Sequence, residues 1–147
     1  MIRYRRPKQD DAVIMHLIET ELVPLSSMTP KQLDETKKEL PKRLSQGVTL
    51  VASPYYEADA LGFVHFMLHG DLLYIDMLAV APAAKRKRWG NLLMVHAERF
   101  ANSRGCKRSK LMVDTVNSSG LAFYSKLGYS TIRLHSSSQS YELEKFL

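Results

Sequence analysis

The chain has 147 residues, of which 45% are hydrophobic, 24% charged and 9% aromatic. This composition is typical of a folded globular protein and excludes the disordered, collagen-like and coiled-coil classes, and the length predicts one domain over residues 1–147. The formal net charge is +6, and the single cysteine, Cys106, excludes an intramolecular disulfide framework and a multi-cysteine metal site.

The N-terminal part predicts a strand followed by two helices. Residues 2–5 are typical of a strand, and Asp10 can cap a helix that continues to about residue 22, before Pro24. The run Thr29-Pro30-Lys31-Gln32 combines a capping box with proline at the first helical position. It predicts a second helix that ends near Leu44.

The pattern then changes to alternating apolar and polar residues, which is typical of strands. The expected elements are strands at 48–53, 61–69 and 72–80, a helix at 89–104, a strand at 110–113, a short helix from Asn117 to about 128, and closing strands at 129–134 and 141–146. The order βααβββαβαββ predicts a mixed α/β fold.

The positive charge is concentrated in one segment. Residues 83–110 carry a net charge of +8 while residues 9–82 carry −6, and the densest basic run is Lys85-Arg86-Lys87-Arg88. A helix that begins near Trp89 would present unpaired backbone N–H groups directly after this run, which favours a phosphate ligand. Neither a Walker P-loop nor a G-x-G-x-x-G fingerprint is present. Charge alone leaves a nucleic acid, an anionic membrane or a phosphorylated small molecule as the partner.

The segment around this run resembles the cofactor-binding segment of the GNAT-superfamily N-acetyltransferases. In that family an apolar strand with V-x-P precedes [RQ]-x-x-G-x-[GA] and a helix with paired leucines. The chain has Val80-Ala81-Pro82, then Lys85 through Gly90, then Leu92-Leu93. Two positions differ: Lys85 stands in place of arginine or glutamine, and Arg88 stands in place of the middle glycine.

A second resemblance lies in residues 117–129. The family signature is N-x-x-A-x-x-[FL]-Y-x-K-x-G-[FY], and Gly120 replaces its alanine. The matching residues are Asn117, Phe123, Tyr124, Lys126, Gly128 and Tyr129. The resemblance implies a GNAT-like, largely antiparallel central sheet flanked by helices, with acetyl-CoA as co-substrate and no metal. The residues it assigns to cofactor binding are Leu78, Ala79, Val80, Lys85, Arg86, Lys87, Arg88, Trp89, Gly90, Asn91, Asn117, Tyr124 and Lys126.

The resemblance also implies direct attack of a primary amine on the thioester. Tyr124 matches the family's tyrosine that protonates the departing thiolate as a general acid. Asp76 is a lone carboxylate in an apolar strand and is expected to share a face with Tyr74 and Leu78, so it is the candidate for receiving the amine proton. A purely structural aspartate is the alternative. His65 is expected to pack within or at the edge of the sheet.

The acceptor is expected to be a small-molecule or peptide amine. The acidic residues of the two N-terminal helices would favour a cationic amine, such as a polyamine, an aminoglycoside or a lysine, or they form an ordinary solvated face. They are Glu19, Glu21, Asp34 and Glu35. The loop from Pro24 to Pro30 is expected to set acceptor selectivity.

Two other functions stay open at this point. One is an acyl-CoA-binding regulatory module with weak or no catalysis, and the other is a nucleic-acid-binding module that uses Lys85–Arg88. The second requires aromatic residues among the charges, and only Trp89 offers one. The longest apolar stretch is Met77–Ala84 and no signal peptide is recognisable, so we expect a cytoplasmic protein without a membrane partner. A homodimer is left open.

Overall fold

The structure is a computed structural model that describes residues 1–147, and its elements follow the predicted order. The strands are β1 (Ile2–Tyr4), β2 (Val48–Ala52), β3 (Gly62–His69), β4 (Leu72–Val80), β5 (Arg108–Asp114), β6 (Ser130–His135) and β7 (Ser140–Phe146). The helices are α1 (Pro7–Leu17), α2 (Pro30–Ser45), α3 (Trp89–Ser103) and α4 (Ser118–Lys126). Short helical turns are η1 (Ile18–Leu22, π-helical), η2 (Val23–Leu25, 3₁₀) and η3 (Pro82–Ala84, 3₁₀).

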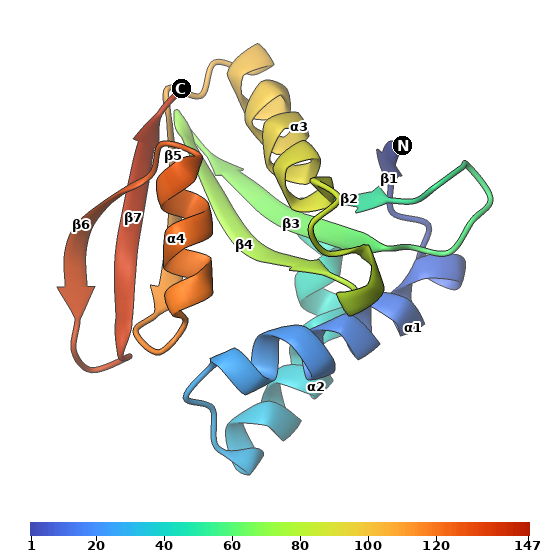
Figure 1. Cartoon of the computed structure of the whole chain (residues 1–147), viewed down its shortest axis with the longest axis horizontal. Coiled ribbons are helices and arrows are strands. Elements are labelled where there is room, and N and C mark those ends of the chain that lie inside the picture. The colour runs from blue at the N-terminus through green and yellow to red at the C-terminus, as the bar shows by residue number, and fades with distance from the viewer.

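All seven strands form one sheet in the order β1-β2-β3-β4-β5-β7-β6 (Figure 1). Every pair of neighbours is antiparallel except β4 and β5, which are parallel. The predicted mixed α/β fold with a largely antiparallel sheet is therefore confirmed. Helix α3 connects the two parallel strands and supplies the crossover that parallel pairing requires.

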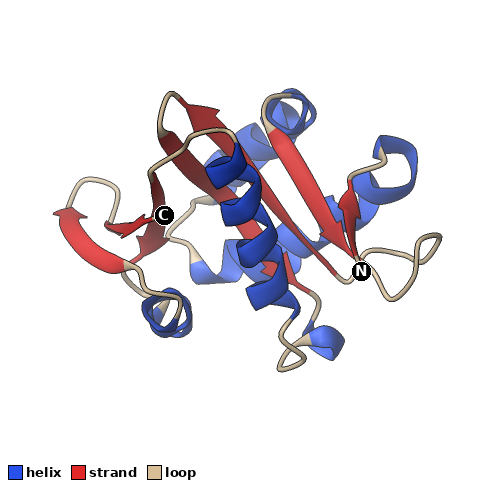
Figure 2. Cartoon of the chain, turned by 90° about the horizontal axis from the view of Figure 1, so that it is seen from above, coloured by secondary structure: helices blue, strands red, loops and turns tan.

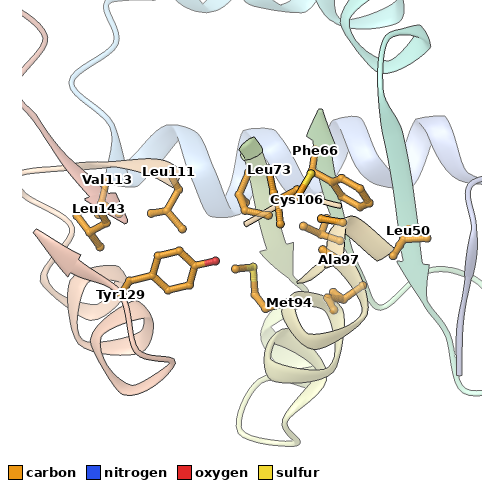
Figure 3. Packing of buried hydrophobic residues seen from close by; sticks show 14 of the residues in the cluster. Leu50, Phe66, Leu73, Met94, Ala97, Cys106, Leu111, Val113, Tyr129 and Leu143 are labelled. Atoms are coloured by element: carbon orange, nitrogen blue, oxygen red, sulfur yellow. The ribbon is translucent and has the colours of Figure 1, made fainter. Parts of the chain in front are cut away.

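The helices cover both faces of the sheet (Figures 1 and 2). Helices α3 and α4 pack on one face, over a hydrophobic cluster that includes Phe66, Leu73 and Met94. Figure 3 shows the Tyr129 ring reaching into this cluster. Helices α1 and α2 cover the other face over a second cluster, which includes Ile14, Leu40, Val51, Phe63 and Met77. None of the helices has the length and apolar composition needed to cross a membrane.

The first helix begins earlier than the sequence pattern predicts. It starts at Pro7 with Arg6 as the N-cap residue, so the prediction that Asp10 caps the helix is wrong. The Asp10 carboxylate lies in the first turn, where it accepts hydrogen bonds from the Arg6 backbone N–H (2.7 Å) and from the buried Arg3 guanidinium (2.7 and 2.9 Å). Proline at the first helical position, with its fixed φ, begins the helix here.

The second helix begins as predicted. Thr29 accepts a hydrogen bond from the Gln32 backbone N–H, and the Gln32 side chain accepts one from the Thr29 backbone N–H. This reciprocal pair satisfies two N–H groups that a helix start otherwise leaves without partners. The helix ends at Ser45, and Gly47, with φ of 82°, makes the turn into β2.

Candidate active site

Strands β4 and β5 pair over only part of their length. Their register runs from Leu72 with Arg108 to Ile75 with Leu111. After these residues the two strands no longer pair, over residues 76–80 of β4 and 112–114 of β5. A pocket of about 820 Å³, lined by both strands, opens there. The β4 backbone groups on this side lack strand partners, so an extended ligand can take their hydrogen bonds.

A β-bulge in β4 lies at the point where the strands part. Phe66 of β3 is opposite Ile75, but the preceding residue, His65, is opposite Met77. Asp76 is therefore the extra residue, with no partner in β3. A bulge bends its strand and is a common way of redirecting a side chain next to a functional site.

The bulge reverses the faces to which later residues of β4 point. Ile75 belongs to the cluster beneath α3, whereas Met77 belongs to the cluster beneath α1 and α2. The expectation that Asp76 and Leu78 share a face is therefore wrong, because Leu78 packs against the α3 cluster while Asp76 meets α2. The extra residue shifts the two-residue alternation by one position.

Asp76 is nearly buried, with 5% of its side chain exposed, and it is paired with Arg43 of α2. Arg43 Nε donates to Oδ2 at 2.8 Å and Nη2 donates to Oδ1. His65 Nε2 lies 3.7 Å from Oδ2, and His65 Nδ1 is 2.8 Å from Thr49 Oγ1. His65 is fully buried in the sheet, and burial lowers its pKa. Sequence reasoning missed Arg43, since no motif distinguishes it from the other charged residues of α2.

The loop before α3 and the first turn of that helix present a row of unbonded N–H groups. The backbone N–H groups of residues 86–91 donate to no backbone or side-chain acceptor, and Leu92 is the first to bond, to the Arg88 carbonyl. Arg86 and Arg88 both have a φ of 65°, in the left-handed region. Successive N–H groups in such a segment, at the positive end of a helix dipole, form an anion-binding concavity. This geometry fits a pyrophosphate.

The left-handed conformation explains why the matching position of the family pattern is glycine. Arg88 is the N-cap residue of α3, with φ of 65° and ψ of 17°. A Cβ in this region is strained, whereas glycine adopts it readily. The chain therefore holds an arginine at a position whose backbone favours glycine.

The four basic side chains of the loop are exposed and differ in their surroundings. Lys85, Arg86 and Arg88 line the pocket, whereas Lys87 does not. Lys85 Nζ is 2.6 Å from Glu21 Oε1 of η1, and this contact lowers the pKa of Glu21. The loop is thus connected directly to the segment between α1 and α2.

Tyr124 of α4 is half-buried and lines the pocket. Its ring makes edge-to-face contacts with Phe123 and Tyr129, at centroid distances of 5.0 and 5.8 Å. Burial raises the pKa of Tyr124, so the hydroxyl keeps its proton at neutral pH. A protonated phenol in an apolar wall is able to act as a proton donor.

Asn117 caps α4, as its position predicts, and accepts a hydrogen bond from the Gly120 backbone N–H at 2.9 Å. A methyl group at residue 120 would collide with the Asn117 carboxamide, so glycine in place of the family's alanine gives this cap its room. The other predicted cofactor residues also line the pocket. They are Leu78, Ala79, Val80, Trp89, Gly90, Asn91 and Lys126.

The segment between α1 and α2 lines the pocket on the side of the sheet that α1 and α2 cover. Of the four acidic residues that the sequence predicts to frame the acceptor, only Glu21 lines it. Glu19 pairs with Lys37 at 3.1 Å on the exposed surface. The loop is held across the pocket by Ser27, whose backbone N–H (3.0 Å) and hydroxyl (2.9 Å) donate to Asp114 Oδ2 at the end of β5. Sequence reasoning did not anticipate this tether.

Comparison with known proteins bears on what this pocket does. The model of the acetyltransferase (GNAT) family matches residues 15–129. No curated protein matches the chain. Among solved structures, PaiA N-acetyltransferase from Thermoplasma acidophilum, in complex with coenzyme A, is 18% identical with a TM-score of 0.83, covering 100% of this chain and 98% of its own.

Two further structures share the fold. Ard1 from Thermoplasma volcanium is 20% identical with a TM-score of 0.74, and the alignment covers 100% of this chain and 97% of its own. IAA acetyltransferase from Bacillus cereus is 18% identical with a TM-score of 0.73, covering 100% and 99%. The family match extends over most of the chain, including the open part of the sheet and the loop before α3. The chain therefore belongs to the acetyltransferase (GNAT) family, and it is an acyltransferase with acetyl-CoA as its co-substrate.

Proposed function

We propose that the protein transfers the acetyl group of acetyl-CoA to a primary amine of a small molecule or peptide by direct attack. The observation that carries this proposal is the pocket through the open part of the sheet. It joins a row of unbonded N–H groups on the α3 side to a cavity beneath η1 and η2 on the other side, and the protonated Tyr124 lines it. Because all seven strands, from Ile2 to Phe146, form one sheet, we also propose that residues 1–147 constitute one catalytic domain.

The cofactor is proposed to lie along β4 and across the start of α3. Backbone groups of Leu78, Ala79 and Val80 bond the pantetheine arm in the manner of an added strand. The N–H groups from Arg86 to Asn91 bind the pyrophosphate, and Lys85, Arg86 and Arg88, which line the pocket, add positive charge beside it. Side chains of α4 and of its N-cap residue complete the site. They are Asn117, Tyr124 and Lys126.

In the proposed reaction the neutral amine nitrogen attacks the thioester carbonyl carbon. The new C–N bond forms, the C–S bond breaks, and the Tyr124 hydroxyl gives its proton to the departing sulfur. The proton lost by the amine nitrogen restores the phenol through solvent, so the products are an N-acetyl amine and coenzyme A. The supporting observation is that Tyr124 lines the same pocket as the end of β4 that has no partner in β5.

Asp76 is proposed to act at the acceptor end. Both of its oxygens accept hydrogen bonds from Arg43, which supports a positioning role in which the pair holds the bulge and the α2 wall in place. The role of proton acceptor, predicted from the sequence, requires one oxygen to face the amine instead. The two roles differ in their pH profiles, and variants of both residues separate them.

Thermal unfolding with and without acetyl-CoA tests the cofactor site. A ligand at 100 times its dissociation constant stabilises the folded state by about 2.7 kcal/mol. An unchanged unfolding temperature at millimolar acetyl-CoA would contradict the proposal.

Substitution of the tyrosine tests the chemistry. We expect Tyr124→Phe to lower kcat by roughly 100-fold, because general-acid catalysis contributes about that much or more, with little change in acetyl-CoA affinity. Tyr141→Phe is the matched control, because Tyr141 is a half-buried tyrosine of β7 that does not line this pocket. An unchanged kcat in Tyr124→Phe would remove the general-acid role, and a module that only binds acyl-CoA would show no turnover in the wild type.

A further inference from the structure

We infer that the acceptor is a small primary amine on an uncharged, apolar body, such as an alkylamine or an arylalkylamine. This inference rests on the proposed function and names the substrate class of the same pocket. It differs from the cationic acceptors, such as polyamines, that the acidic composition of residues 9–82 favours.

The acceptor end of the pocket has a mainly apolar wall. Between α1 and α2, five apolar side chains line it. They are Ile18, Leu22, Val23, Leu25 and Met28. Leu25 is 38% exposed and Met28 is 41% exposed, so neither belongs to the buried core. Exposed apolar side chains that gather at the mouth of a pocket indicate a ligand with apolar surface.

These apolar side chains are held in place rather than left on a free loop. The Ser27 backbone N–H and hydroxyl both donate to Asp114 Oδ2, at 3.0 and 2.9 Å, and so tie the loop to the end of β5. Leu25 and Met28 flank this tether on either side. Two hydrogen bonds thus connect the loop to the sheet at the residue between its two exposed apolar side chains.

The charged groups at this end are already occupied within the protein. Glu21 pairs with Lys85 at 2.6 Å, and both oxygens of Asp76 bond Arg43. Asp114 accepts two hydrogen bonds from Ser27 at one oxygen and one from a backbone N–H, at 3.1 Å, at the other. A second ammonium group on the acceptor would meet carboxylates that are each already paired, and it would lie near the Arg43 guanidinium, which is 40% exposed.

Steady-state kinetics with a panel of amines test the inference, with release of the coenzyme A thiol as the readout. The panel contains hexylamine, 2-phenylethylamine and spermidine. We expect kcat/KM for the two apolar amines to exceed that for spermidine by at least tenfold. A value for spermidine equal to or above that of hexylamine would overturn the inference while leaving the proposed acetyl transfer intact.

A matched pair of variants tests the wall itself. Leu25→Ser should raise KM for hexylamine roughly fivefold without changing acetyl-CoA affinity, because a ligand loses apolar contact area at this residue. Leu134→Ser, at an exposed leucine of β6 outside the pocket, should leave KM unchanged. Equal KM values in the two variants would contradict the assigned wall.

A binding measurement separates failure of the inference from failure of the proposed function. Calorimetric titration of each amine into the protein saturated with coenzyme A ranks their affinities without turnover. If acetyl-CoA raises the unfolding temperature but no amine is acetylated, tighter binding of hexylamine than spermidine still supports the inference, and the reverse order overturns it. No thermal shift with acetyl-CoA and no thiol release with any amine would instead contradict the proposed function.

Discussion

Arg88 at the start of α3 allows a test of the local backbone that does not depend on activity. Its φ of 65° and ψ of 17° place a residue with a Cβ in the left-handed region, which costs roughly 1–2 kcal/mol. Glycine removes this strain, but its greater freedom in the unfolded chain lowers the free energy of unfolding by roughly 0.5–1 kcal/mol. We therefore expect Arg88→Gly to be more stable than Arg88→Ala by about 0.5–1 kcal/mol. Both variants lose the same charge, so the comparison isolates the backbone.

Urea denaturation and thermal unfolding measure this difference. For a chain of this size, 1 kcal/mol corresponds to roughly 2–4 °C in unfolding temperature. The control is the same pair of substitutions at Arg99, an exposed residue inside α3, where glycine should be less stable than alanine by about 1 kcal/mol. If Arg88→Gly were no more stable than Arg88→Ala while the Arg99 pair behaved normally, residue 88 would not occupy the left-handed region.

Three further predictions follow from ion pairs. If Asp76 only positions α2, Arg43→Met should lower kcat/KM as much as Asp76→Asn does, and neither variant should change the dependence of kcat/KM on pH. A loss of rate together with a changed pH dependence at acidic pH, seen in Asp76→Asn alone, would instead identify Asp76 as the base. Glu21→Gln should raise acetyl-CoA affinity up to about fivefold at low salt, because it releases the Lys85 side chain, which is 54% exposed, from this pair. Titrations across salt should show the gain disappearing. Burial alone would raise the pKa of Asp10, but hydrogen bonds from its buried arginine partner and a backbone N–H outweigh it and lower the pKa. The stability that Asp10 contributes is thus present above about pH 4 and is lost as pH falls through its folded pKa. Asp10→Asn should lower the free energy of unfolding, measured in urea at pH 7, by about 3–5 kcal/mol, since it leaves a buried cation unpaired. If the difference in this free energy between variant and wild type did not narrow below about pH 4, the pairing of an ionised Asp10 with Arg3 would be contradicted.

The elements of the fold were predictable where local signals agreed with one another. The capping box at Thr29 fixed the start of α2, and β4 spans the predicted residues 72–80 without change. Asn117 was recognisable because the same residue serves as a helix cap and belongs to a spaced motif. In each case the deciding interaction lies within a few residues of sequence, where periodicity and capping preferences operate.

The parts that the sequence did not predict depend on long-range contacts. The local pattern predicts Asp10 as a helix cap, whereas its carboxylate pairs with Arg3 of β1. The local pattern does not show where the Arg3 side chain lies. The pairing of Asp76 with Arg43 spans 33 positions, and the Ser27 tether to Asp114 spans 87. The sequence shows that Arg88 stands where the family pattern has glycine. The backbone dihedral angles show why glycine is favoured there.

The bulge and the opening of the sheet are connected steps in the making of the pocket. Pairing of β4 with β5 ends at Ile75, and Asp76, the next residue, is the bulge in the pairing with β3. After the bulge, alternate side chains of β4 exchange faces, so Leu78 packs on the α3 side while Met77 packs on the α1 side. One extra residue thus bends β4 where it leaves its parallel neighbour and directs the carboxylate toward α2. Because β4 no longer pairs with β5 after this point, backbone groups of β4 face the space between the two strands, where the acyl donor is proposed to bind. The donor and acceptor ends of the pocket therefore depend on one local irregularity, and a change that straightened β4 at Asp76 would alter both together.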